Sequence, residues 1–264
     1  MSGLSIDRLA AQLADLGVEH GDTVMVHASL RAVGPVEGGA AGLITALDRA
    51  VGPEGSLLMV LGARDDWAWV NELPEEERAD LLAEAEPFDA LRTPAEPDVG
   101  TLAEVFRTHP GTRVSDHPEG RFAARGRLAE TLTAEPPWDD YFGPGSPLAR
   151  LLAADGKVLR LGADPDTATL LHHAEYLAPL PAKRRVRRHR RVLGPNGPEL
   201  RVVECLDDSN GVVDRPGEDY FTTIVRSYLA LGAHRRGTIG NAVSELIDGR
   251  HLVEFAASWM TEHL

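Results

Sequence analysis

The chain contains a single cysteine, Cys205, among its 264 residues. One thiol excludes both an internal disulfide and any metal site built from several thiolates. A lone cysteine is more often a buried structural residue than a nucleophile, so we expect Cys205 to lie in the core. No apolar run approaches the ~20 residues of a membrane span, and the first residues lack a signal-peptide pattern. The sequence therefore predicts a cytoplasmic protein that does not bind a membrane.

Basic side chains are scarce, with 27 Lys and Arg against 41 Asp and Glu, which gives a formal net charge of -14. Such a surface repels nucleic acid and anionic lipid and favours cationic partners. The exception is the run 183–191, in which seven of nine residues are Lys or Arg. Because no aromatic residues alternate with them, this run favours a solvated strand or an anion contact over a nucleic-acid surface.

Apolar runs and amphipathic segments alternate along the first two thirds of the chain. The runs 23–29 and 55–62 predict buried strands, and 38–52 predicts a helix between them. A strand, a helix and a strand within about 40 residues form a βαβ unit, which favours a parallel sheet covered by helices. Further helices are predicted at 5–17, 99–111 and 167–178, a helix and a strand within 146–164, and two closing helices joined by a short connector. The predicted fold class is α/β.

Two segments depart from this alternation. Residues 63–98 are acidic and interrupted by prolines, which is typical of an excursion from the sheet, so we expect a pocket wall or lid. Residues 183–208 have strand-like arms on either side of "GPNGP", which predicts a long antiparallel β-hairpin. We expect the whole chain, 1–264, to form one domain that carries both segments.

The stretch "HASLRAVGPVEGG" joins the first predicted strand to the next helix. Its small residues would let backbone N–H groups approach an anion at the helix N-terminus, so a phosphate site at 29–39 is one interpretation. The spacing fits neither a Walker loop nor a GxGxxG fingerprint, and a glycine-rich turn without a ligand is the alternative. His27 stands at the end of this strand.

Two further groups of side chains could carry chemistry. His172 and Glu175 lie three residues apart on a predicted helix, so the carboxylate could orient the imidazole for proton abstraction. The alternative is a solvated surface pair. Acidic doublets, Asp65-Asp66 and Asp207-Asp208, follow predicted strands and could converge on a polycation, whereas turn capping is the simpler interpretation. No spacing of a metal site is present, so we expect no metal.

Four segments together resemble the aminoglycoside 3-N-acetyltransferase family, also called the antibiotic N-acetyltransferase family. They are "MVHASLRAVGPVEGG", "PDVGTLAEVFRTHPGTRVSDHPEGRFAARG", "GPGSPLARLLAADGKVLRLGAD" and "TATLLHHAEYLA", and their order and spacing match the family over roughly residues 5 to 210. The resemblance implies a three-layer α/β/α fold with a largely parallel or mixed central sheet. It also implies transfer of an acetyl group from acetyl-CoA to the 3-amino group of a 2-deoxystreptamine aminoglycoside.

The resemblance also implies roles for individual residues. It implies His172 and Glu175 as the catalytic pair, with His27 as the competing candidate for the base. It implies acetyl-CoA contacts at Ser29, Leu30, Arg31, Val36, Gly38 and Gly39, with His117 and Phe122 beside the pantetheine arm. It implies that Asp65, Asp66, Asp207 and Asp208 lie near the cationic aminoglycoside. We expect direct transfer in a ternary complex, in a monomer or a homodimer.

Three positions depart from the family pattern. Arg121 replaces a serine, and Cys205 and Asp208 replace a glutamate and a threonine after the second hairpin strand. Arg121 could contact either ligand. These changes keep a second hypothesis open, an acyl-CoA-dependent transferase that acts on a different biosynthetic amine. A third is a non-catalytic nucleotide or nucleic-acid binder that uses the 29–39 loop and the basic run.

Overall fold

A seven-stranded mixed sheet lies at the centre of the molecule, with strand order β3-β4-β2-β1-β5-β9-β8. The computed structural model describes residues 3–215, 217 and 219–264, so residues 1, 2, 216 and 218 of the predicted domain lie outside the described part. The strands are β1 (Thr23–Ala28), β2 (Ser56–Val60), β3 (Arg113–Val114), β4 (Phe122–Gly126), β5 (Lys157–Leu161), β8 (Arg235–Ile239) and β9 (Ala242–Asp248). β1 pairs in parallel with β2 and β5, and antiparallel strands flank this core. The predicted α/β class is confirmed.

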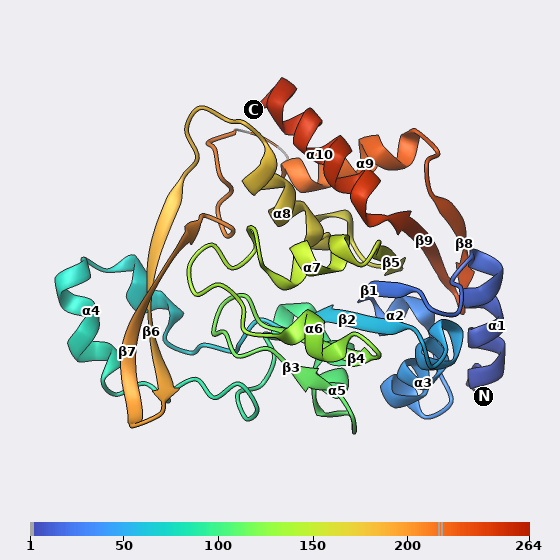
Figure 1. The fold of residues 1–264 in the computed structure, drawn as a ribbon, viewed down its shortest axis with the longest axis horizontal. Helices are drawn as coiled ribbons and strands as arrows, with labels where there is room; N and C mark the ends of the chain where they lie inside the picture. Colours follow the sequence, from blue (N-terminus) through green and yellow to red (C-terminus); the bar gives the residue numbers. More distant parts are fainter. Residues whose placement is uncertain (1–2, 216, 218) are drawn as a thin grey trace.

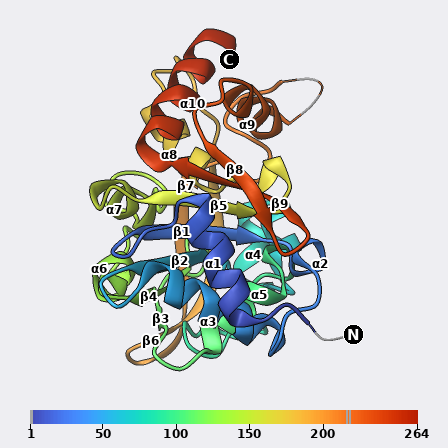
Figure 2. The same ribbon diagram turned by 90° about the vertical axis from the view of Figure 1, so that its right-hand side faces the viewer.

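Helices cover both faces of the sheet because the side chains of a buried strand alternate between the faces. Val24 and Val26 join one apolar cluster and Met25 joins the other. The first cluster contains α1 (Ile6–Leu16), α3 (Gly39–Val51) and α5 (Thr101–Thr108). The second contains α6 (Ala129–Thr133), α7 (Pro147–Ala153), α8 (Leu170–Leu177), α9 (Tyr220–Ala230) and α10 (Gly249–His263). Figures 1 and 2 show the resulting three layers.

The short connector predicted before the last helix is wrong. Residues 235–248 instead form the hairpin of β8 and β9, and β9 pairs antiparallel with β5. Gly240 and Asn241 make its two-residue turn, and Gly240 has a φ of 62°, as tight hairpin turns of this kind require. The Gly-Asn dipeptide was therefore the signal in the sequence for this turn.

The predicted hairpin at 183–208 is present as β6 (Arg185–Gly194) and β7 (Gly197–Leu206), which form a separate two-stranded sheet. The 63–98 segment lies beside it and contains the 3₁₀ turn η1 (Ala68–Glu72), helix α4 (Glu75–Leu82) and the 3₁₀ turn η2 (Pro97–Val99) (Figure 1). The Asn71 side chain bonds both the N–H and the C=O of His189, at 2.7 and 3.3 Å. Phe88 makes a second backbone bridge, to Val192. These contacts attach the 63–98 segment, which we call the wall, to the hairpin.

Candidate functional site

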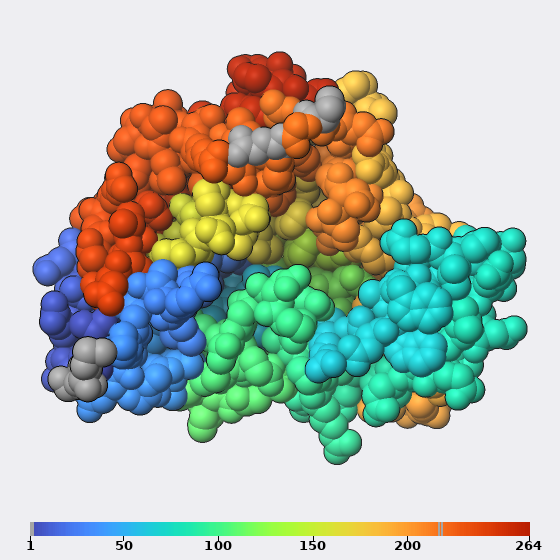
Figure 3. Space-filling view, turned by 180° about the vertical axis from the view of Figure 1, so that it is seen from behind, coloured from blue at the N-terminus to red at the C-terminus, as the bar shows by residue number. Residues whose placement is uncertain are grey.

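Two adjoining cavities open at the carboxyl ends of the parallel strands, where ligand sites of open α/β sheets are found. The first, which we call the β1 cavity, has a volume of about 390 Å³ and is lined by His27, Ser29 and the segment 162–164. The second, the His172 cavity, has a volume of about 580 Å³. They share the lining residues Val60, Asp98, Val99 and Thr169, so together they form one cleft. Figure 3 shows this face hollowed where the blue, green and yellow parts of the chain meet.

His172 and Glu175 form a hydrogen-bonded pair on α8. The Nδ1 atom of His172 lies 2.8 Å from Oε2 of Glu175, as their three-residue spacing on a helix predicts. The imidazole stacks on Phe142, with ring centroids 4.9 Å apart, and packs against Phe221 at 4.7 Å. These contacts fix the ring. No described residue hydrogen-bonds to Nε2, the nitrogen on the other side of the ring.

The environment of His172 raises its pKa. Burial alone would lower the pKa, but the hydrogen bond and the charge of Glu175 outweigh it, and the charge of Asp208 adds to them. The carboxylate of Glu175 is 1% exposed, so bulk water screens this interaction poorly. His172 is thus a stronger base than a free imidazole, and the bond at Nδ1 leaves Nε2 as its proton acceptor.

Tyr220, at the start of α9, completes the pair from a distant part of the chain. Its hydroxyl donates to Oε1 of Glu175 and accepts from the backbone N–H of Val212. Both oxygens of the buried carboxylate therefore have partners, which offsets the cost of burying its charge. Sequence reasoning missed Tyr220, because no local pattern links two residues 45 positions apart.

His27 lies in a different environment at the end of β1. Its residue surface is 6% exposed, and Nε2 is buried without a hydrogen-bond partner among the described residues. Burial, helped by the charge of neighbouring Arg160, lowers the pKa of His27 to about 4. His27 is neutral near pH 7 and is the weaker base of the two candidates.

The loop predicted to bind phosphates contains the short helix α2 (Leu30–Val33), capped by the Ser29 hydroxyl. Gly38 and Gly39 have left-handed φ angles of 72° and 60° and lead into α3. Ser29 lines the β1 cavity. The other predicted coenzyme residues lie beyond its lining; these are Leu30, Arg31, Val36, Gly38 and Gly39. Arg31 is exposed and has no ionic partner among the described residues.

His117 and Phe122 are both completely buried. The Nδ1 atom of His117 accepts the backbone N–H groups of Glu119 and Gly120, and its Nε2 lies 2.8 Å from the carbonyl oxygen of Trp138. A side chain with no exposed surface cannot touch a bound pantetheine arm. Both side chains support the 117–122 turn from beneath, and their place beside the pantetheine arm stays a prediction.

Arg121, one of the departures from the family pattern, is also completely buried and contacts neither cavity. Its guanidinium donates to the carbonyl oxygens of Gly62, Ala90 and Pro94 and lies over the Phe88 ring. Arg121 therefore has no surface in the cleft with which to contact either ligand. Its side chain attaches the 63–98 wall to the end of the sheet.

The four predicted substrate acids separate into two groups. Asp65 and Asp208 line the His172 cavity. Asp66 is exposed, pairs with Arg64 and lines another cavity, which the wall and strand β6 form together. Asp207 is 2% exposed and caps the turn after β7 by accepting the backbone N–H groups of Ser209 and Asn210. Turn capping, the simpler interpretation, therefore accounts for Asp207.

Besides Glu119, which pairs with arginine, sequence reasoning missed three acids of the His172 cavity, Glu72, Glu96 and Asp98, which all come from the 63–98 wall. None of them has a salt-bridge partner among the described residues. Burial raises the pKa of Glu96, and the nearby charge of Asp98 raises it further. The cavity thus presents carboxylates that a cationic ligand can pair with.

Cys205 is buried as expected, with 1% of its surface exposed. Burial raises the pKa of its thiol to about 12, so the thiolate that a covalent mechanism needs is scarce at neutral pH. Among the described residues no group of three or more His, Cys, Asp or Glu side chains could hold a metal ion, and no helix is long and apolar enough to cross a membrane.

Comparison with known proteins identifies the family. Residues 25–261 match the family model described as aminoglycoside 3-N-acetyltransferase. The aminoglycoside N(3)-acetyltransferase VII of Streptomyces paromomycinus is 40% identical over 97% of this chain and 91% of its own length. The structure of AAC-IIIb with CoASH superimposes with a TM-score of 0.94 at 40% identity, covering 100% of this chain and 98% of that one. Sisomicin-bound AAC-VIa gives 0.93 at 38%, covering 99% of both chains. The chain belongs to the aminoglycoside 3-N-acetyltransferase family.

Proposed function

We propose that this protein transfers an acetyl group from acetyl-CoA to the 3-amino group of 2-deoxystreptamine aminoglycosides and so confers antibiotic resistance. The observation that carries the proposal is a histidine-carboxylate pair in a cleft of two joined cavities, one of them rich in unpaired acids. The acidic His172 cavity suits a cationic acceptor, and the β1 cavity remains for acetyl-CoA. The relatives whose structures contain CoASH or sisomicin support the same pair of substrates.

His172 serves as the general base in this proposal. Acetyl-CoA, when bound, would supply the thioester: the amine forms the new C–N bond, the C–S bond breaks and CoA leaves as the thiol. An aminoglycoside amine is largely protonated at neutral pH, so a base must remove a proton before nitrogen becomes a nucleophile. His172 lines the His172 cavity, and its Nε2, which has no described hydrogen-bond partner, can accept that proton, while Glu175 and Tyr220 hold the imidazole in place. Direct transfer is favoured because Cys205, the one thiol, is buried and protonated.

We place acetyl-CoA in the β1 cavity, with its phosphates toward the first turn of α3. The N–H groups of that turn have no intrahelical acceptors, and the helix dipole favours an anion there. Gly38, the N-cap, has no side chain to occupy this end of the helix. Ser29, His27 and Thr169 then line the inner part of the path toward His172.

Replacing Arg31 with glutamine should raise the KM of acetyl-CoA about fivefold to tenfold, because one charge-assisted contact to phosphate is lost. Acetyl-pantetheine, which lacks the nucleotide phosphates, should show no such change. Arg49→Gln is the matched control, since Arg49 lies at the opposite end of α3. Steady-state kinetics with both donors measure the effect, and an equal change with the two donors would contradict this placement.

The pH dependence of turnover should depend on Glu175. A base must be unprotonated, so kcat/KM should rise with pH through the pKa of His172. Glu175 holds this pKa up, so Glu175→Gln should move the rising limb to lower pH and also lower the plateau. Profiles of kcat/KM between about pH 5 and 9 measure the shift of the rising limb. The same acceptor is used with the unmodified protein and with Glu175→Gln, so that the titration of the acceptor is common to the two profiles. Tyr220→Phe keeps the carboxylate and should keep the limb near its original position.

The function itself is tested by release of CoA thiol in the presence of acetyl-CoA and a panel of amines. We expect turnover with kanamycin-like or gentamicin-like acceptors, and acetylation at the 3-amino group in the isolated product. Turnover that requires only simple monoamines would instead support the transferase acting on another biosynthetic amine. Binding of CoA without amine-dependent turnover would overturn the proposal.

A further inference from the structure

The basic run of the hairpin places two arginines inside an acidic cavity. Residues two positions apart on a strand share a face, so Arg188 and Arg190 of β6 both point toward the His172 cavity, which they line. Their side chains are only 15% and 9% exposed. A cationic acceptor therefore meets two buried guanidinium groups in the same cavity as the carboxylates that attract it.

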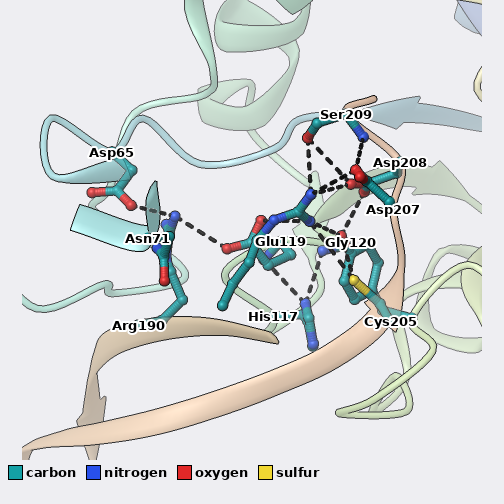
Figure 4. Close-up of polar contacts among 12 residues, drawn as sticks. Asp65, Asn71, His117, Glu119, Gly120, Arg190, Cys205, Asp207, Asp208 and Ser209 are labelled. Atoms are coloured by element: carbon teal, nitrogen blue, oxygen red, sulfur yellow. Dashed lines mark hydrogen bonds and ion pairs between the residues drawn. The ribbon is translucent and has the colours of Figure 1, made fainter. Parts of the chain in front are cut away.

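Three carboxylates lie within 3.7 Å of the two arginines and hold them in place, and a fourth, Asp207, lies 4.0 Å from Arg188. Arg190 pairs with Asp65 at 2.5 Å and with Glu119 at 3.2 Å. Arg188 pairs with Asp208 at 2.6 Å and lies 3.7 Å from Glu119, so Glu119 stands between the two guanidinium groups. Figure 4 shows the row from Asp65 through Arg190 and Glu119 to Asp208. Breaking one ion pair of such a buried network would leave the charge of its partner uncompensated. This cost disfavours rearrangement of the side chains.

The two guanidinium groups differ in how many donors remain free. Both terminal nitrogens of Arg188 are engaged, by Tyr141 and Cys205 on one side and by Asp208 and Ser209 on the other. In Arg190, the contacts with Asp65 and Glu119 both fall on Nη1. Its Nε and Nη2 groups have no acceptor within the described part of the chain. The charge of Arg190 also acts on Glu96, an unpaired acid of the same cavity.

Arginine has N–H donors and no acceptor, so it binds oxygen atoms and repels ammonium groups. We propose that Arg190 is a specificity-determining residue of the His172 cavity. It binds a hydroxyl or ether oxygen of the acceptor and disfavours an amino group at the same carbon atom of the acceptor. This inference rests on the proposed function, because it concerns the acceptor of that site. The acids of the 63–98 wall attract the polycation, and Arg190 restricts which of its substituents faces the hairpin.

The test compares acceptors that differ by a hydroxyl or an amino group at one carbon, namely kanamycin A against kanamycin B and paromomycin against neomycin. Calorimetric Kd values are measured for the unmodified protein, Arg190→Gln and Arg190→Lys. In Arg190→Gln, the affinity of the amino compound relative to its hydroxyl partner should rise about tenfold in at least one pair, because a repulsive charge is removed. Arg190→Lys keeps the charge and should leave both ratios within about threefold of the original.

Asp65→Asn/Arg190→Gln guards against misfolding, because it removes both members of the ion pair and leaves no uncompensated charge between them. It should show the same change in ratio. Ratios that stay unchanged in both pairs, in the single and the double variant, would overturn the proposal. Binding does not require turnover, so selective binding without acetyl transfer would instead count against the proposed function and leave the role of Arg190 supported.

Discussion

His172→Ala should lower kcat at least ~100-fold, the lower range for the loss of a general base, and leave the KM of acetyl-CoA within about threefold. The reason is that His172 lines the His172 cavity, that its Nε2 has no described hydrogen-bond partner and that its pKa is raised. Glu175→Gln should cost less, because the imidazole remains and loses only its orientation and part of its basicity. Single-turnover and steady-state rates with one aminoglycoside measure both effects.

His27→Gln is the comparison that separates the two candidate bases. The pKa of His27 is held near 4, so its loss should affect coenzyme binding more than the proton-transfer step. A nearly normal kcat in the His27 variant, beside a low one in the His172 variant, is therefore expected. The opposite pair of results would exchange the two roles.

Local patterns were sufficient to predict most of the elements around the site. The apolar run at 23–28 is typical of a strand buried on both faces. The amphipathic pattern of α8 is typical of a helix buried on one face. The His172–Glu175 contact follows from helical spacing alone. The hairpin of β8 and β9 was missed because its polar edge strand lacks a long apolar run.

Contacts between distant segments could not be predicted in this way. Tyr220 reaches Glu175 from another helix, and Arg121 attaches to carbonyl oxygens of the 63–98 wall. The acidic doublets were predicted to lie near the substrate because two adjacent acids are visible in the sequence itself. Pairing with arginine depends on the fold, so only the structure separates the paired Asp65 from the unpaired Glu96 and Asp98.

Glu96→Gln/Asp98→Asn should raise the KM of the aminoglycoside roughly 100-fold at low salt and barely change that of acetyl-CoA. Each acid is unpaired among the described residues and lines the cavity beside His172. A hydrogen bond from an ammonium group to a carboxylate contributes about 1.5–3 kcal/mol, and about 1.4 kcal/mol corresponds to a tenfold change in affinity. The free energies of two such contacts add, and solvent weakens the one at the more exposed Asp98. Together they correspond to the roughly 100-fold rise in KM.

The control for this prediction is Asp7→Asn/Glu54→Gln, which likewise removes two negative charges, but from exposed ion pairs that do not line the cleft. If bulk charge alone attracted the acceptor, both double variants would raise its KM alike. A local effect should appear only in the cavity variant, and added salt should reduce the difference, because exposed charges are screened over ~8–10 Å. An unchanged acceptor KM in the cavity variant would move acceptor binding to Asp65 and Asp208, whose carboxylates would then have to leave Arg190 and Arg188 to pair with the aminoglycoside.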